Sequence, residues 1–422
     1  MLVEFRVKNF RSIRDDLCLS MVASKDREKA TTNTVETGIP AIPTLLRSAV
    51  VYGPNASGKS ALVSAMQFAQ AVVATSATLK PDQPLNYAPF KLDPVTLTQP
   101  SEFEFTFIQD KVRYQYGFAL LPDRIAEEWL YVYKAPKPQT WFERKGLADS
   151  VHAYTFGSSL VGQRKVWQAA TRSNALFLST AVQLNSDSLR PIYDWITSHL
   201  SIFAAGTQPM FDFSTNRAAT DDGKKILVDF LNAADIGISD LSTRVQKQHV
   251  FNVEISENGP LHTVSEREVS VPLFMHRSAN ASAIFQMEEE STGTQRLFAF
   301  AAPIIDALKV GRAVVVDELD GSLHSHITRF LVQLFHRPAR DGSAAQLIFT
   351  THDTSLLDAN VFRRDQIWFM EKGQDQVSTI VPLSEFSPRK NEALERGYLS
   401  GRYGALPMIE DIEDFDDFVQ KD

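Results

Sequence analysis

The sequence predicts an α/β fold, in which a mixed central sheet lies beside an antiparallel sheet and a mostly helical region is inserted. Three observations lead to this prediction. A short apolar run, a Gly-rich turn and a helical pattern follow one another over residues 48–78. Apolar runs at 312–318 and 346–353 are typical of parallel strands that are covered on both faces. Apolar and polar residues alternate over 103–118, which indicates a half-buried antiparallel hairpin.

The composition is ordinary for a globular protein. The chain has 422 residues, more than one compact core usually holds, and 44% of them are hydrophobic. A net charge of −8 argues against a uniformly basic nucleic-acid binder. The single cysteine, Cys18, excludes a disulfide framework within one chain and suits a reducing compartment. The N-terminus alternates like a strand and lacks the apolar core of a signal peptide, so we expect a cytoplasmic protein with no membrane partner.

The strongest motif is a phosphate loop. It consists of Gly53, Pro54, Asn55, Ala56, Ser57, Gly58, Lys59 and Ser60. Every fixed position of the pattern G-x-x-x-x-G-K-[ST] is filled, and the loop lies between an expected strand and an expected helix. Glycines let backbone N–H groups point at phosphate oxygens, and the helix N-terminus adds the positive end of its dipole. Lys59 would reach the outer phosphates of a nucleotide, and the Ser60 hydroxyl would bind Mg²⁺.

The first part of the chain should be rich in strands. Strands are expected over residues 2–8 and near 17–21, and a loop without periodicity over 24–44. Several prolines should make 80–100 irregular. Alternation beyond the 103–118 hairpin extends it into a meander that reaches about residue 144.

The middle of the chain changes character. Helices are expected over 188–203 and 222–234, and strands that return to the core over 250–288. We therefore divide the chain into an N-terminal lobe, an inserted region and a C-terminal lobe, with the bounds 1–158, 159–282 and 283–422. The acidic tail, 410–422, reads as either a frayed end or a partner-docking segment.

Further candidates lie at the ends of the two late apolar runs. Asp317 and Glu318 follow one run, and His352 follows the other. Because open α/β sheets bind ligands at the carboxyl ends of their strands, we expect these residues at one edge. Asp317 would hold Mg²⁺, and Glu318 would orient or deprotonate the attacking water as general base. His352 would donate a hydrogen bond to the γ-phosphate. An apolar run before Asp-Glu is common by chance, and the phosphate loop gives this pair its weight.

A second anion site is indicated at the turn Ser291–Gly293. It precedes a helical pattern for which Gly311 is a plausible C-terminal stop. Serine and glycine at a helix N-terminus can bind an anion, although a simple Ser N-cap would leave the same residues. One phosphate loop does not need this turn within its own subunit. Two chains packed head-to-tail would use it, each placing Ser291 and Gly293 on the nucleotide of the other.

These four elements, in this order, resemble the ABC-type ATPases of the SMC, RecF and OLD-like branch. The matching residues are Gly53–Ser60 as Walker A, Ser291–Leu297 as the signature turn, Val314–Glu318 as Walker B and His352 as the switch histidine. The opening Val7–Ile13 also looks like this branch, which makes Arg11 a candidate nucleotide contact. The resemblance implies a P-loop NTPase with an ABC-type head, and ATP and Mg²⁺ as its cofactors.

The resemblance also departs from the family pattern. The signature turn reads Ser-Thr-Gly-Thr where Ser-Gly-Gly-Gln is usual. The glutamine loop could contain Gln83, Gln109 or Gln115. The residues that follow the ATPase lobe show no acidic cluster of the Toprim type, so the chain looks like the ATPase without the nuclease that OLD proteins carry.

Two runs, residues 317–324 and 401–407, are most like bacterial ATP-binding proteins, many of which form the ATPase half of anti-phage systems such as PARIS. The resemblance implies an ATP-hydrolysing switch in a homo-oligomer with shared ATP sites, which gates a separate effector such as a Toprim-type nuclease. One alternative is a RecF-like or SMC-like repair or chromosome-maintenance ATPase that binds DNA directly. The other is an ATP-bound scaffold that sequesters a toxin.

Overall fold

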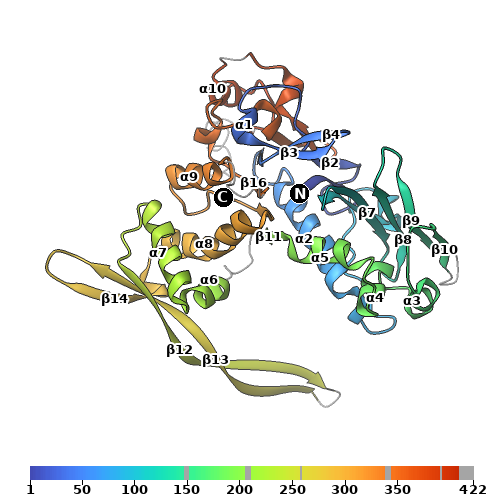
Figure 1. Ribbon diagram of the computed structural model, residues 1–422, viewed down its shortest axis with the longest axis horizontal. Helices are drawn as coiled ribbons and strands as arrows, with labels where there is room; N and C mark the ends of the chain where they lie inside the picture. The colour runs from blue at the N-terminus through green and yellow to red at the C-terminus, as the bar shows by residue number, and fades with distance from the viewer. Residues whose placement is uncertain (147–151, 205–210, 257–258, 338–343, 390–391, 408–422) are drawn as a thin grey trace, which may run out of the picture. The chain divides into compact units, whose positions relative to one another are not determined.

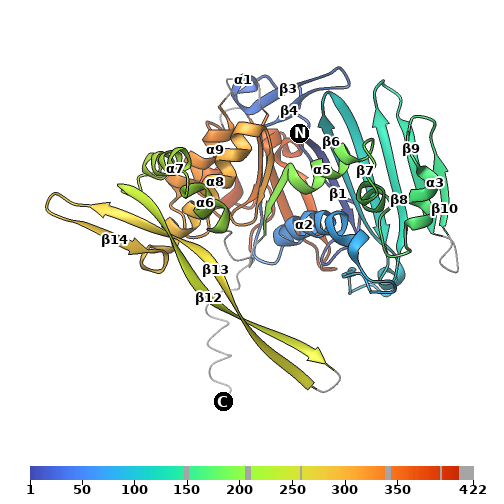
Figure 2. The same cartoon turned by 60° about the horizontal axis from the view of Figure 1, so that its bottom comes forward.

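The chain forms two compact units. The computed structural model describes residues 1–146, 152–204, 211–256, 259–337, 344–389 and 392–407. The first unit contains Met1–Ala205, Val310–Leu319 and Val332–Asp422, and the second contains Gly206–Lys309 and Asp320–Leu331. The three predicted regions, with boundaries after residues 158 and 282, stay a prediction. Figures 1 and 2 show the elements of both units, and the acidic tail lies outside the described residues.

The first unit contains a seven-stranded antiparallel sheet with the strand order β10-β9-β8-β7-β6-β1-β2. Its strands are β1 (Leu2–Lys8), β2 (Leu17–Ser20), β6 (Ser101–Gln109), β7 (Val112–Leu120), β8 (Ile125–Tyr133), β9 (Gln139–Gly146) and β10 (His152–Phe156). β6 and β7 form the predicted hairpin, and its turn residues Asp110 and Lys111 have φ of 51° and 61°. Positive φ at both turn positions is typical of a type I′ turn, whose twist matches that of the strands. The predicted meander is confirmed.

The same unit contains the central sheet, with the strand order β11-β15-β16-β5-β17-β18. Its strands are β5 (Ser48–Tyr52), β11 (Leu200–Phe203), β15 (Ala313–Val316), β16 (Gln346–Thr350), β17 (Ile367–Lys372) and β18 (Ser378–Pro382). Five strands are parallel and β18 is antiparallel to β17, so the sheet is mixed as predicted. Every residue of β5, β15 and β16 is buried, as expected for strands covered on both faces. Helix α2 (Lys59–Thr75) contacts β1, β6 and β11, and so joins both sheets to one core.

The strand β11 corrects one expectation. The sequence predicts a helix over 188–203, but α5 (Arg190–Ser198) ends early and β11 begins at Leu200. β11 pairs in parallel with β15, from Leu200 opposite Ala313 to Phe203 opposite Val316. Pairing at the sheet edge satisfies the backbone of this segment, and it outweighs the helical spacing of its apolar residues.

The expected loop over 24–44 is also wrong. It contains the short helix α1 (Ala30–Asn33) and the hairpin of β3 (Thr34–Ile39) and β4 (Ile42–Leu46). Side-chain hydrogen bonds hold this hairpin in place, because the Asn33 amide donates to the Val361 carbonyl at 2.9 Å and to Gln366 Oε1 at 2.7 Å. Polar contacts between residues far apart in the sequence produce no apolar periodicity, so the sequence pattern does not reveal this hairpin.

The second unit combines helices with a separate three-stranded sheet. Its elements are α6 (Phe211–Ala218), α7 (Asp221–Ala233), β12 (Asp240–Ser256), β13 (Gly259–Arg277), β14 (Ser282–Gln286), η4 (Met287–Glu289) and α8 (Thr292–Val310). The strands over 250–288 were expected to return to the core. They pair instead with one another in the order β12-β13-β14, and β12 with β13 form the long twisted ribbon of Figure 2. α8 ends before Gly311, whose φ of 76° confirms the predicted stop.

The remaining elements are short. They are α3 (Arg164–Ala170), α4 (Phe177–Gln183), α9 (Ser325–Phe335), α10 (Leu394–Leu399), η1 (Ser76–Thr78), η2 (Thr96–Thr98), η5 (Thr354–Leu356), η6 (Arg364–Gln366) and η7 (Leu383–Phe386). Among the described helices, the stretch Lys59–Thr78 has the length and composition of a membrane span. Half of that stretch is buried within the fold, as in the core helix of a globular protein.

Candidate nucleotide-binding site

The phosphate loop connects β5 to α2, as predicted, and its backbone requires both motif glycines. A Cβ on Gly53 would lie 2.1 Å from the carbonyl oxygen of Met370. Gly58 caps α2 with φ of 113°, and a Cβ there would lie 2.3 Å from Ser378 Oγ. No side chain larger than hydrogen fits at either position. The loop therefore presents its backbone at the N-terminus of a 17-residue helix, where N–H groups and the helix dipole favour an anion.

Lys59 lies under this loop and is only 5% exposed. Its ammonium donates hydrogen bonds to the carbonyl oxygens of Gly53 at 2.7 Å and Pro54 at 3.0 Å. Ser57 is 1% exposed, and its hydroxyl has no hydrogen-bond partner among the described residues. The Gly-rich loop therefore combines the buried Lys59 cation with the Ser57 hydroxyl, which has no partner among the described residues. A phosphate group fits this arrangement, because it accepts hydrogen bonds from both.

The two acids occupy different environments at the end of β15. Asp317 is 3% exposed, whereas Glu318 is exposed and has φ of 53°. Thr350 on the neighbouring strand β16 contacts both residues. Its hydroxyl donates to Asp317 Oδ1 at 2.6 Å and accepts the Glu318 N–H at 2.7 Å. A left-handed backbone at a residue other than glycine is strained, and such strain gathers at functional sites.

Strand register brings the candidates to one edge of the sheet. β16 lies between β5 and β15, with Thr350 opposite Val51 and Phe349 opposite Val316. The three strands are parallel, so their carboxyl ends coincide. Gly53, Asp317 and His352 each follow one of these ends. The predicted common edge is confirmed, and it is the edge at which open α/β sheets bind ligands.

A cavity of about 850 Å³ opens beside the phosphate loop. Loop residues 53–57 and His352 line it, which brings the predicted histidine together with the predicted loop. Lys59, Ser60, Asp317 and Glu318 are not among its lining residues. They lie under the loop, at the start of α2 and at the end of β15.

The C-terminal segment forms the other wall of the cavity. The sequence did not predict that this segment lies at the site. This wall includes Tyr398, Gly404 and Ala405. The Tyr398 hydroxyl donates to the Ala405 carbonyl at 2.8 Å, and its ring stacks on Phe369 at 5.3 Å. The Ala405 N–H donates to Glu371 Oε2 at 3.2 Å. The glycines and aromatic residues of 398–407 were the available signal, but nothing in their spacing indicates the strand they contact.

Arg11 lies beside α2 and does not line this cavity. Its Nη1 donates to Ser64 Oγ at 3.0 Å, and its backbone has φ of 51°. Ser64 is one helical turn after Ser60 on α2, so Arg11 lies near the phosphate-loop helix. A nucleotide contact from Arg11 stays a prediction.

The signature turn lies in the second unit, at the start of α8. Ser291 Oγ accepts the N–H of Thr294 at 3.1 Å, as an N-cap does. A Cβ on Gly293 would lie 2.7 Å from the carbonyl oxygen of Ser322. The turn thus contacts the loop that follows the Asp317–Glu318 pair in the sequence. The cap is compatible with a further role, and the predicted contact of this turn with another chain's nucleotide remains untested.

The predicted magnesium ligands fit that ion in their chemistry. Ser60 and Asp317 offer a hydroxyl and a carboxylate, the hard oxygen donors that Mg²⁺ prefers. No group of three or more His, Cys, Asp or Glu side chains with metal-binding geometry occurs within the described residues. A site with one carboxylate would not meet that criterion, since phosphate and water complete such a set.

A family model described as "AAA domain, putative AbiEii toxin, Type IV TA system" matches residues 48–358, from the strand before the phosphate loop to beyond His352. No curated protein matches the chain. The SMC head domain from Thermotoga maritima is similar at 12% identity and a TM-score of 0.41, covering 90% of this chain and 98% of that one. An SMC head bound to the C-winged helix domain of ScpA is similar at 13% identity and a TM-score of 0.38, covering 90% and 96%. At these scores neither likeness bears on function.

Proposed function

Because the chain belongs to the family of AbiEii-type AAA domains, whose model matches residues 48–358, we propose that it is an ATP-hydrolysing switch of the ABC/SMC-like type. The observation that carries this proposal is the arrangement at one sheet edge. Thr350 bonds both Asp317 and Glu318, while the phosphate loop and His352 follow the adjacent strand ends. A chain in which nucleotide served only as a structural element would not need an exposed, strained glutamate there.

The candidates of the phosphate loop and of the two strand ends each have a role in this proposal. Lys59 and the backbone N–H groups of the loop bind the phosphates, and Ser60 with Asp317 holds Mg²⁺. Glu318 orients or deprotonates the attacking water, and His352 donates a hydrogen bond toward the γ-phosphate. When bound, ATP with Mg²⁺ supplies the bond that is hydrolysed.

The switch itself requires a second chain. We propose that two copies close around ATP, each placing its Ser291–Gly293 turn on the nucleotide of the other. Nucleotide then shifts the equilibrium through contacts that exist only in the closed state. The turn's position at the N-terminus of the 19-residue helix α8 supports an anion-binding role.

The output of the switch is a separate effector, a nuclease or toxin in anti-phage defence. The type IV toxin–antitoxin wording of the family supports a toxin-related role. The same wording favours a second candidate, a scaffold that holds a toxin and uses ATP only to stay folded. Direct DNA binding is the weaker alternative, since the net charge is −8.

The test measures hydrolysis and assembly together. Phosphate release is measured for the wild-type chain and for Glu318→Gln. Both proteins are then captured by affinity from cells that also express the genes next to that of this chain. The mass of each captured assembly is measured with ATP, with ADP and without nucleotide. If the chain is a switch, the mass of the assembly should increase with ATP and the variant should hydrolyse ATP slowly. The captured effector should dissociate when ATP is hydrolysed. A scaffold predicts equal effector capture in all nucleotide states and no turnover.

A further inference from the structure

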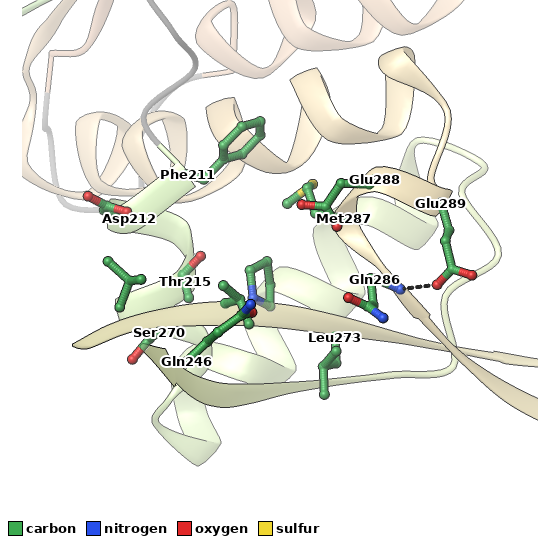
Figure 3. Close-up of a pocket in the computed structure, with 13 residues that line it drawn as sticks. Phe211, Asp212, Thr215, Gln246, Ser270, Leu273, Gln286, Met287, Glu288 and Glu289 are labelled. Carbon is green, nitrogen blue, oxygen red and sulfur yellow. Dashed lines mark hydrogen bonds between the residues drawn. The ribbon is translucent and has the colours of Figure 1, made fainter. Parts of the chain in front are cut away.

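A second cavity, of about 720 Å³, lies within the second unit. Helix α6, strands β12 and β13 and the turn η4 form its walls (Figure 3). Apolar side chains cover much of the surface, including Phe211, Leu273 and Met287. Met287 is 8% exposed, whereas Phe211 and Leu273 are half-buried. Apolar walls of this kind bind the side chains of a ligand by removing them from water.

The charged residues of this cavity are all acidic. Asp212, Glu288 and Glu289 line it, and no lysine, arginine or histidine does so among the residues whose side chains the structure describes. The Glu289 carboxylate accepts the N–H of Gln286 at 2.7 Å, which fixes it at the rim (dashed in Figure 3). Asp212 and Glu288 are exposed. Their field attracts a cationic ligand and repels phosphate groups.

One buried polar group in this cavity has no partner. Thr215 is 1% exposed, and its hydroxyl makes no hydrogen bond to any described residue. Its neighbour Ser214 differs, because Ser214 Oγ accepts the N–H of Ala302 at 3.2 Å. Figure 3 shows the Thr215 side chain extending from α6 toward the cavity that it lines. A buried hydroxyl without a partner destabilises the fold, and a ligand that bonds it removes that cost.

We propose that this cavity binds a basic peptide segment of a partner protein, one that alternates cationic and apolar side chains. The cations pair with Asp212 and Glu288, the apolar side chains contact Phe211 and Met287, and the peptide backbone bonds Thr215. Charge excludes two other occupants. The chain's own tail is acidic, so the carboxylates of the cavity repel it. They also repel the phosphate groups of a nucleic acid. The site is separate from the phosphate loop and does not depend on nucleotide.

Fluorescence anisotropy with the full-length chain tests this proposal. The probe is a labelled peptide of alternating lysine and leucine, with a glutamate–leucine peptide and single-stranded DNA as comparison ligands. The double variant Asp212→Asn with Glu288→Lys should weaken binding of the lysine peptide by about tenfold or more, because it removes one charge and inverts another. Asp222→Asn with Asp229→Lys is the matched control. Those residues are exposed on α7 of the same unit, and the change in net charge is the same.

Thr215→Val tests whether the Thr215 hydroxyl binds the peptide, because a purely structural role would leave peptide affinity unchanged. The substitution keeps the shape of the side chain and removes the hydroxyl, so it should raise stability and weaken peptide binding several-fold. Lys59→Ala should leave peptide binding unchanged, which separates this proposal from the nucleotide site. Equal losses in the test and control doubles would overturn the proposal. So would equal binding of the glutamate peptide, competition by DNA, or unchanged affinity in Thr215→Val.

Discussion

Thr350 Oγ1 donates to Asp317 Oδ1 at 2.6 Å and accepts the Glu318 N–H at 2.7 Å. One hydroxyl on β16 therefore orients two acids at the end of β15. The Leu319 N–H also bonds the Thr350 carbonyl at 3.0 Å. Moving the Asp317 carboxylate or the Glu318 backbone would break a bond to this threonine, which makes Thr350 a positioning residue.

Thr350→Val should lower ATP turnover by about 10- to 100-fold, the usual cost of losing a group that orients a metal ligand. The reason is that the carboxylate of Asp317 and the backbone of Glu318 both lose their partner. Steady-state phosphate release over a range of Mg²⁺ concentrations measures the effect, and half-maximal turnover should require a higher Mg²⁺ concentration than in the wild type. Thr350→Ser keeps the hydroxyl and should recover most of the activity. If valine and serine behave alike, the hydroxyl does not position the acids.

Lys59→Ala should abolish measurable ATP binding. The side chain is buried and holds the loop carbonyls of Gly53 and Pro54, so its loss removes both a phosphate contact and a support of the loop. Titration calorimetry with ATP and Mg²⁺ gives the binding constant. The exposed Lys80 provides a control, since Lys80→Ala should bind as the wild type does. Wild-type affinity in Lys59→Ala would mean that the phosphate-loop assignment is wrong.

Two substitutions at Glu318 separate chemistry from strain. Glu318→Gln should bind ATP, hydrolyse it far more slowly and accumulate the closed assembly, because the amide cannot accept a proton. Glu318→Gly should also be inactive, yet it should raise the free energy of unfolding by up to about 1 kcal/mol, since glycine adopts a φ of 53° without strain. Turnover assays and denaturant titrations measure the two effects. Unchanged turnover in the Gln variant would assign the base to another residue.

The sequence predicted the site better than it predicted the elements around it. The phosphate loop fills eight adjacent positions of a specific pattern, and it gives weight to the buried strands that end in acids or histidine, which alone are common by chance. Their meeting at one edge follows from parallel pairing alone. The role of Thr350 could not be predicted, because it depends on which strand lies beside β15. The C-terminal wall around Tyr398 depends in the same way on packing against Phe369.

Two of the wrong expectations, those for β11 and for residues 24–44, share one physical cause. β11 reads as the end of a helix, and Asn33 stands in a stretch that reads as a loop. In each case hydrogen bonds to residues more than 100 positions away decide the structure, from β11 to β15 and from Asn33 to Gln366. Local periodicity carries no information about such partners.

Complementation of two inactive variants tests the shared site. Ser291→Arg and Lys59→Ala should each be inactive alone. Mixed in equal amounts, they should recover about a quarter of wild-type activity, because half of the dimers are mixed and each mixed dimer has one intact site. Ser291→Ala is the control for loss of the N-cap, which costs about 1 kcal/mol of stability without adding bulk. Absence of recovery in the mixture would contradict a site completed by a second chain.

The stability of the first unit should depend on pH through His336. This side chain is 7% exposed, and its Nε2 lies 2.8 Å from Ser48 Oγ on β5. Burial, and secondarily the charges of Arg47 and Lys29, lower the pKa of His336 from 6.5 to about 4. The folded state therefore binds its proton less readily than the unfolded state does.

The contribution of His336 is complete above pH 6.5, where the imidazole is neutral in both states. It should be lost as the pH falls from 6.5 toward 4, by on the order of 3 kcal/mol, because the unfolded chain takes up the proton first. Urea titrations at several pH values measure the free energy of unfolding. His336→Gln keeps a partner for Ser48 but does not titrate, so its stability should fall less than that of the wild type over this range. Parallel curves for the two proteins would show that His336 is not buried in its neutral form.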